Sequence, residues 1–275
     1  MKLTTKIILG FLLTVFLSAL IFIIGFSFTD RKNYSRQFSI VIKMPQDNIT
    51  GIELPPFKTI LIDEVVVESK DLNYALTADC SLLFDSAPVN SDPEMLFIPG
   101  VLKDFISINS SNDTLIVRLN LRDWVEKYGN DEHEYQTISG VNLHFNVSNF
   151  DIITYNKILP IKIKNIETDS IKISSYGNID IDSCNTQFID PQSMNDYCKL
   201  SITNSNIKRL NLDLDNMRHW NIQNCNIEEE YITASGRHDI IQYPNESSII
   251  NWIPKNKNSE LNIKIQGETR KITIQ

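Results

Sequence analysis

Apolar and polar positions in the second half of the chain repeat with a period of about 20 residues. Four asparagines mark the repeat, and they are Asn165, Asn185, Asn206 and Asn226. Four positions before each one stands an isoleucine, at Ile161, Ile181, Ile202 and Ile222. Six positions before each one stands another large apolar residue, at Leu159, Ile179, Leu200 and Trp220. A fifth asparagine, Asn245, keeps only Ile241 of this pattern. Columns matched over four windows predict internal structural repeats with a degenerate last copy.

Within each repeat the apolar positions alternate with polar ones, which predicts one half-buried strand. A second alternation follows in several repeats, at Ile171 and Ile173 and, more fully, at Leu210, Leu212 and Leu214. Two short strands per repeat favour a parallel β-helix, in which each strand pairs with its copy in the next turn. We therefore predict an all-β fold, with β-solenoid repeats and a C-terminal cap over residues 141–275.

The asparagines have a structural role in this prediction. Asparagine tolerates the left-handed backbone conformation that a corner between two strands requires. Stacked side-chain amides can also hydrogen-bond to one another along the solenoid as a ladder. We therefore expect stacked corners at the four asparagines of the repeat.

A leucine-rich-repeat-like solenoid is the alternative architecture. Its L-x-x-L-x-L-x-x-N/C-x-L template fits Tyr197, Leu200, Ile202, Ser205 and Ile207. However, the segment after each asparagine has the pattern of a strand rather than a helix, and a leucine-rich repeat needs only one strand. The parallel β-helix is therefore favoured.

The amino terminus carries an almost unbroken apolar run over residues 7–26. The run is long enough to span a bilayer, and no Ala-x-Ala cleavage site follows it. We predict an uncleaved transmembrane anchor over residues 1–28 rather than a signal peptide, with a polar linker over residues 29–37. Lys2 and Lys6 favour a cytoplasmic amino terminus, so the rest of the chain would be extracytoplasmic, in the cell envelope.

Residues 38–140 form a less regular region that still predicts strands. Leu115, Val117, Leu119 and Leu121 alternate with polar residues, whereas residues 84–104, which contain three prolines, read as a long loop.

Composition and charge narrow the choice of partners. The chain has 275 residues, enough for a sizeable core, and a net charge of −8. No cluster of Lys and Arg beyond the one at residues 31–36 offers a phosphate-binding surface, which argues against nucleic acid as a partner.

The four cysteines are interpreted as buried free thiols. Cys184 and Cys225 stand in the same column two repeats apart, and at about 4.8 Å per strand they would lie roughly 9–10 Å from each other. That distance is too long for a disulfide. Cys80 and Cys198 lie outside the column, and no C-x-x-C spacing supports a zinc site.

Several polar clusters are candidates for chemistry, and each has a simpler explanation. The acidic turn with Glu126, Asp131, Glu132 and Glu134 beside His133 could bind a cation, but it lacks calcium-loop spacing and also fits a solvated loop tip. Two pairs of carboxylates, Asp180 with Asp182 and Asp213 with Asp215, should point outward from one strand each. Such pairs serve polysaccharide lyases and glycoside hydrolases, but any solvated strand shows them too.

Three aromatic residues near the carboxy terminus, Tyr231, Tyr243 and Trp252, could stack on a sugar or cover the end of the core. The four histidines have no metal-ligand spacing, and no motif of a named catalytic family is found. We therefore assign no catalytic, cofactor-binding or metal residue.

Three short motifs suggest a family resemblance. They are Phe57-Lys58-Thr59-Ile60, Asn112-Asp113-Thr114-Leu115-Ile116 and Ser139-Gly140-Val141-Asn142. In this order, after an apolar amino terminus and before the repeats, they resemble the putative autotransporter adhesin head (GIN) domain family over most of residues 50–250. The glycine-rich repeats of that family are Asn- and Ile-rich here. The resemblance implies a β-helical envelope protein without catalytic residues.

The sequence thus predicts a membrane-anchored, extracytoplasmic β-solenoid that acts as a non-catalytic binding, adhesion or envelope-structural module. The expected partners are the membrane, through residues 7–26, and an envelope protein or a glycan, with no cofactor. The alternative is a carbohydrate-active enzyme, a polysaccharide lyase or glycoside hydrolase built on a β-helix.

Overall fold

The computed structural model describes residues 14–19, 39–46, 48–66, 75–86, 94–128, 135–148, 150–154, 159–193, 198–217, 219–240, 249–263 and 273–274. Within these residues the chain is almost entirely β-structure, as expected. The helical elements of the β region are η1 (Gly100–Phe105) and α2 (Leu121–Tyr128).

One large sheet has nine strands. Its strands are β1 (Ser39–Lys43), β2 (Ile49–Glu53), β4 (Ala75–Ser86), β5 (Met95–Pro99), β8 (Tyr135–Val147), β10 (Ile161–Lys164), β12 (Ile179–Asp182), β14 (Lys199–Thr203) and β16 (His219–Gln223). They follow the order β16-β14-β12-β10-β4-β8-β5-β2, and β1 also pairs with β8. The sheet is mixed, because β5 runs antiparallel to β8 and to β2 whereas the other pairs are parallel.

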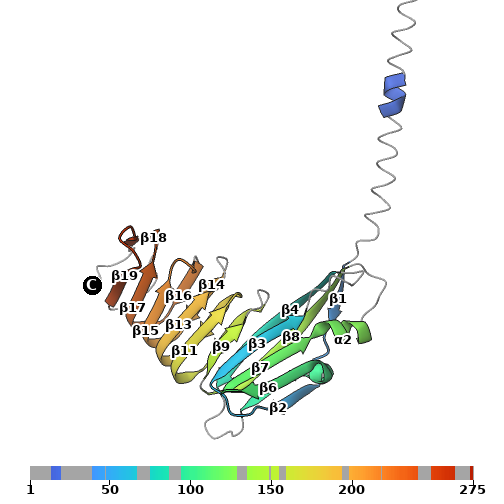
Figure 1. Cartoon of the computed structure of the whole chain (residues 1–275), viewed down its shortest axis with the longest axis horizontal. Helices are drawn as coiled ribbons and strands as arrows, with labels where there is room; N and C mark the ends of the chain where they lie inside the picture. Colours follow the sequence, from blue (N-terminus) through green and yellow to red (C-terminus); the bar gives the residue numbers. More distant parts are fainter. Residues whose placement is uncertain are drawn as a thin grey trace, which may run out of the picture.

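The other large sheet has ten strands. They are β3 (Thr59–Val66), β6 (Ile106–Ser111), β7 (Thr114–Asn120), β9 (Asp151–Thr154), β11 (Glu167–Ser175), β13 (Asn185–Ser193), β15 (Asn206–Asp213), β17 (Asn226–Ala234), β19 (Ile249–Pro254) and β21 (Thr273–Ile274). Their order is β21-β19-β17-β15-β13-β11-β9-β3-β7-β6, with only β6 and β7 antiparallel. A small parallel pair, β18 (Arg237–Ile240) with β20 (Glu260–Ile263), lies at the carboxy-terminal end (Figure 1).

The core lies between the two large sheets. Strand residues alternate between buried and accessible positions, so Ile181 and Ile202 of one sheet and Leu210 and Ile232 of the other are at most 1% exposed. Aromatic rings fill the amino-terminal half of the core. Phe84 stacks on Phe145 and on the ring of Phe150, with ring centres 4.8 and 5.0 Å apart.

The predicted parallel β-helix, and with it the leucine-rich-repeat-like solenoid, is wrong. The structure is a sandwich of two open, mixed sheets rather than a closed coil or a solenoid. The sequence repeat correctly predicts which strands are neighbours, because each copy pairs in parallel with the next. It does not predict that strands from residues 49–120 extend both sheets. β10 pairs with β4, and β9 joins β11 to β3.

The pairing of the repeat was predicted correctly from the second copy onward. Ile181 pairs with Ile202 and Ile202 with Ile222, in the expected register. The first copy is shifted by two residues, because Ile161 pairs with Ile179 rather than with Ile181. All four isoleucines are nonetheless buried, at most 1% exposed.

The shift changes which residues form the corners. The left-handed residues of the repeat are Asn165, Ser183, Asn204 and Asn224, with φ between 51° and 56°. Asn185, Asn206 and Asn226 instead begin strands and pair with one another in the ten-stranded sheet. An amide ladder does exist at the true corner, since Asn224 Nδ2 donates to Asn204 Oδ1 at 3.4 Å and Asn204 Nδ2 donates to Asp182 Oδ1 at 2.9 Å.

Two further predictions in the amino-terminal region were wrong. Residues 84–104 are not one long loop, since they include the end of β4, the whole of β5 and most of η1. In β5 the buried Leu96 and Ile98 alternate with more accessible residues, as in a strand. The prolines of this segment made that alternation hard to recognise in the sequence. Leu121 begins α2 rather than ending a strand, because Asn120 Oδ1 accepts the Asp123 backbone N–H at 3.1 Å and so caps the helix.

The predicted transmembrane helix over residues 7–26 lies outside the described residues except for residues 14–19, which are helical. In the part of the chain that the structure describes, no helix is long and apolar enough to cross a membrane.

The burial of the four repeat isoleucines predicts a large loss of stability when one of them is truncated. Ile202→Ala should lower the free energy of unfolding by about 2–5 kcal/mol, because it leaves a cavity between strands on both sides. Ile202→Val should cost about 0.5–1.5 kcal/mol. Urea denaturation measures both, with the exposed Lys199→Ala on the same strand as control. A loss for Ile202→Ala no larger than that of the control would contradict the assigned register.

The corner predicts a difference between two substitutions at Asn204. Both Asn204→Ala and Asn204→Gly remove the hydrogen bond to Asp182, but only glycine adopts a φ of 51° without steric cost. The alanine variant should therefore be less stable than the glycine variant by about 1–2 kcal/mol. Thermal and urea unfolding of the two purified variants test this, and equal stabilities would be inconsistent with a left-handed corner at this position.

Candidate functional site

A groove crosses the outer face of the ten-stranded sheet near its carboxy-terminal end. Its cavity volume is about 450 Å³, and we call it the sheet groove. It is lined by Asp190, Gln192, Ser193, Arg209, Asn211, Leu212, Asp213, Asn216, Tyr231, Thr233 and Ile253. These residues come from β13, β15, β17 and β19 and from the turn after β15. Residues far apart in sequence thus meet because parallel pairing brings successive repeats side by side.

The strand register explains why this face is polar. Asn211 pairs with Tyr231, and Tyr231 pairs with Asn251, so these three form one outward row. Buried residues such as Leu210 and Ile232 alternate with them and anchor the same strands in the core. The groove surface is therefore fixed by the packing beneath it.

On this surface an arginine lies between two aromatic rings. The Arg209 guanidinium lies 3.8 Å from the ring centre of Tyr231 and 5.5 Å from that of Phe188. Arg209 Nε also donates to Asn211 Oδ1 at 3.2 Å. The Tyr231 hydroxyl donates to Glu229 Oε2 at 3.0 Å, and this hydrogen bond raises the pKa of Tyr231. Cation–π contacts of this kind restrict both side chains.

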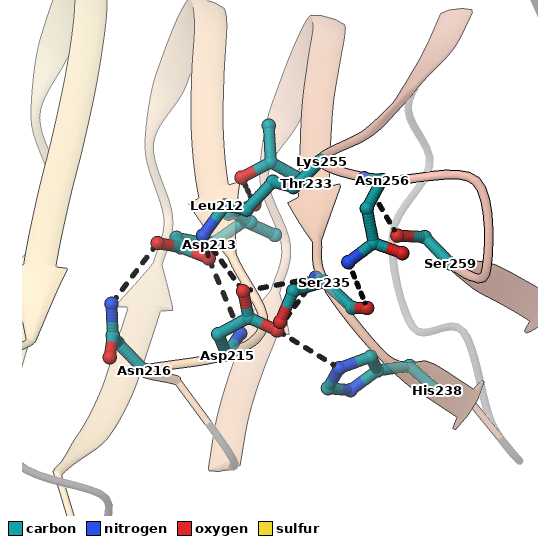
Figure 2. Close-up of polar contacts among 10 residues, drawn as sticks. All are labelled: Leu212, Asp213, Asp215, Asn216, Thr233, Ser235, His238, Lys255, Asn256 and Ser259. Carbon is teal, nitrogen blue, oxygen red and sulfur yellow. Dashed lines mark hydrogen bonds and ion pairs between the residues drawn. The ribbon is translucent and has the colours of Figure 1, made fainter.

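At one end of the groove a lysine joins two carboxylates (Figure 2). Lys255 Nζ donates to Asp213 Oδ1 at 2.6 Å and to Asp215 Oδ2 at 2.9 Å. We call these three residues the lysine clamp. The Ser235 backbone N–H donates to both oxygens of Asp215, at 2.8 and 3.0 Å, and His238 Nε2 lies 3.5 Å from Asp215 Oδ1. The clamp fastens the segment after β19 to the end of β15.

The clamp fixes the charge of Asp215 and of Lys255 near neutral pH. Desolvation by itself would raise the pKa of Asp215, but the hydrogen bonds from Lys255 and Ser235 outweigh it and lower that pKa to about 2. Desolvation likewise favours neutral Lys255, but its bonds to Asp213 and Asp215 prevail and raise its pKa. Asp215 is therefore ionised and Lys255 protonated at neutral pH, so neither is poised to exchange a proton there.

The other predicted pair of carboxylates lies in the nine-stranded sheet. Asp182 Oδ1 accepts hydrogen bonds from Thr203 Oγ1 at 2.7 Å and from Asn204 Nδ2 at 2.9 Å, and these bonds lower the pKa of Asp182. Asp180 pairs in register with Lys162 and Ser201. The two pairs are thus on different sheets, and Asp182 serves the corner of its own sheet.

The structure describes only some of the remaining candidate residues from the sequence. Of the acidic turn, Glu126 is described and pairs with Arg122 at 2.9 Å, whereas residues 129–134 lie outside the described residues. Tyr231 lines the sheet groove, Trp252 packs against the core, and Tyr243 is outside the described residues. All four cysteines are buried and free, as predicted.

Sequence reasoning missed most of the groove. Asp190, Gln192 and Arg209 were not singled out, although each occupies a polar position of an alternating strand. The available signal was the placement of Arg209 between aromatic residues one repeat away on either side, Phe188 and Tyr231. This placement can be recognised only when the pairing register of β13, β15 and β17 is known.

No family model and no curated protein matches this chain. Among solved structures, the chain is similar to a putative adhesin from Bacteroides fragilis, with 13% identity over 85% of this chain and 98% of that chain and a TM-score of 0.47. It is also similar to a putative lipid binding protein from Parabacteroides distasonis, at 14% identity over 86% and 99% and a TM-score of 0.33. A putative adhesin from Parabacteroides merdae is similar at 12% identity over 85% and 98%, with a TM-score of 0.30.

The predicted resemblance to the GIN domain family stays a prediction. Two of the similar structures are described as putative adhesins, but no family model identifies the GIN domain. The TM-scores are all below 0.5, so the function has to be argued from the surface of this chain.

The lysine clamp predicts a pH dependence of stability. Because the pKa of Asp215 falls to about 2 on folding, its contribution is fully present above the ordinary aspartate pKa of about 4 and is lost as the pH falls toward 2. Lys255→Ala should therefore be destabilised most above pH 4, and its difference from the wild type should shrink between pH 4 and 2. Urea denaturation at several pH values measures this.

The exposed Lys257→Ala provides the matched control for that experiment, because it removes the same charge two residues away. It should show a small difference from the wild type at every pH. If Lys255→Ala and Lys257→Ala give parallel curves, the clamp does not hold Asp215 in its ionised form.

Proposed function

We propose that this protein is a non-catalytic binding module and that its ligand lies in the sheet groove. The observation that carries the proposal is the Phe188–Arg209–Tyr231 stack on the outer face of the sheet. Cross-strand contacts of this kind stabilise a sheet. They also order the side chains of the groove before a ligand arrives, which favours binding.

The support of the groove strengthens this interpretation. Its floor belongs to four neighbouring strands whose opposite faces are packed in the core, so it is a rigid platform rather than a loop. Polar groups that converge in a concavity on such a platform are typical of ligand sites. Asp190, Gln192, Asn211 and Thr233 provide these groups here.

The carbohydrate-active enzyme is less well supported by the same surface. Asp213 and Asp215 are both bonded to Lys255, and Asp215 stays ionised well below neutral pH. Hydrolysis of a glycoside needs one carboxyl group that is protonated near the working pH. The lysine clamp provides the opposite environment for Asp215, so we assign it a role in stability.

We keep an extracytoplasmic location as part of the proposal. The four cysteines are compatible with an oxidising environment because they are buried away from solvent. Desolvation raises the pKa of Cys80 to about 12 and that of Cys184 to about 11. The reactive thiolate is therefore suppressed at these positions.

The proposal is tested by binding of the full chain to an array that carries both glycans and proteins. The wild type should bind at least one class of feature, and the double variant Arg209→Ala with Tyr231→Ala should lose that binding. Lys162→Ala, on the nine-stranded sheet, should keep it. The recovered ligand should have its original mass, since no bond is cleaved.

Two outcomes would reject the proposal. Either the double variant binds as well as the wild type while both remain folded by circular dichroism, or the ligand is recovered shortened. The first result would place binding elsewhere on the molecule, and the second would restore the enzyme alternative.

A further inference from the structure

The ligand class can be inferred from the chemistry of the sheet groove, and this step rests on the proposed function. We propose that the groove binds an uncharged glycan chain, which lies across β13, β15, β17 and β19. Three features of the surface carry the inference: its aromatic group, its hydrogen-bonding groups and its charge.

The aromatic group is Tyr231, which lines the groove and is held in place from two directions. Arg209 lies 3.8 Å from its ring centre, and Glu229 Oε2 accepts a hydrogen bond from its hydroxyl group at 3.0 Å. On the face that Arg209 does not cover, a fixed aromatic ring offers a flat apolar surface at little entropic cost. The apolar C–H face of a sugar ring matches that surface, and the exposed Ile253, which also lines the groove, adds to it.

The hydrogen-bonding groups are of both kinds. Asp190 provides acceptors, Gln192 and Asn211 provide amides that both donate and accept, and Thr233 provides a hydroxyl. Sugar hydroxyl groups also donate and accept, and adjacent ones lie close enough to engage a carboxylate or an amide with two bonds. A surface with so many mixed groups therefore suits a polyhydroxylated ligand.

The charge of the groove argues against an anionic ligand. Arg209 is the one cation among the lining residues, and Asp190 lines the same groove. The second lining carboxylate, Asp213, is bonded to Lys255 at 2.6 Å. A sulfated, phosphorylated or uronic-acid polymer is normally bound by clusters of Arg and Lys. The near balance of charges favours an uncharged chain.

The shape of the groove argues against an acyl chain. Leu212 and Ile253 are its aliphatic lining residues, and Leu212 is only 1% exposed. An acyl chain needs an enclosed apolar cavity, whereas this groove is only partly enclosed and polar and apolar atoms contribute to its walls in similar measure. It crosses four strands, hence about 14 Å, which is long enough for a chain of sugars rather than for one.

Affinity gel electrophoresis of the full chain tests the inference. The gels contain dextran, laminarin, galactomannan or xyloglucan as uncharged polysaccharides, and polygalacturonate or heparin as charged ones. At least one uncharged polysaccharide should retard the wild type. Tyr231→Ala should weaken the retardation by about tenfold or more, whereas Tyr231→Phe keeps the ring and should stay within about threefold.

Charge and folding are controlled by further measurements. Lys208→Ala removes a cation next to Arg209 without changing a lining residue, and it should bind as the wild type does. Raising the NaCl concentration from about 50 to about 500 mM should change the affinity by less than about twofold, because an uncharged ligand releases no counterions. Far-ultraviolet circular dichroism confirms that each variant is folded.

The outcomes separate this inference from the proposed function. Two results would overturn the glycan inference but leave the sheet groove as the binding site. In the first, only a charged polysaccharide retards the protein, and in the second, the array shows binding to a protein alone. In both, the effect must be lost in the Tyr231→Ala variant. Retardation by an uncharged polysaccharide that Tyr231→Ala and Arg209→Ala leave unchanged would overturn both. No retardation by any uncharged polysaccharide would also overturn the inference, and the array would then decide the proposed function.

Discussion

Parallel, in-register pairing between successive strand copies is the constraint on which the rest of the structure depends. Side chains alternate along a strand, so a slip of one residue would exchange the core face for the solvent face. The pairs Ile181 with Ile202 and Ile202 with Ile222 fix this register in the nine-stranded sheet, and Leu212 with Ile232 does so in the ten-stranded sheet. Each of these side chains is almost fully buried, so the apolar core itself selects the pairing.

The groove follows from the same constraint. Once Leu210, Leu212 and Ile232 are fixed inward, the intervening Arg209, Asn211 and Tyr231 must point outward, and neighbouring copies place them next to Phe188 and Asp190. The surface that we propose for ligand binding is therefore the outer side of strands whose inner side is packed in the core. This arrangement gives a rigid site without any specialised loop.

The two aspartates at the end of the groove fit two interpretations, a catalytic pair and a structural ion-pair site. Asp213 and Asp215 have the outward geometry that a pair of catalytic carboxylates would need. What decides their role is Lys255, which follows them by about 40 residues and bonds to both. A shared cation keeps Asp215 ionised, so the pair joins two segments of the chain instead of transferring protons.

The sequence by itself determined the all-β class, the period of the repeat and the buried isoleucines, because these follow from local alternation of apolar and polar residues. It also indicated the burial of the cysteines, because free cysteine behaves as a small hydrophobic residue. It misplaced three corners, which lie at Ser183, Asn204 and Asn224 instead of at the expected asparagines. The reason is that the first repeat is two residues shorter than the asparagine spacing predicts, and composition alone does not reveal this difference in length. Only the tertiary structure decided that the repeats join the amino-terminal strands in a two-sheet sandwich, since that depends on pairings such as β10 with β4, whose partners are about 80 residues apart. The same holds for the groove: Arg209 could be recognised as part of a site only after long-range pairing had placed it between Phe188 and Tyr231.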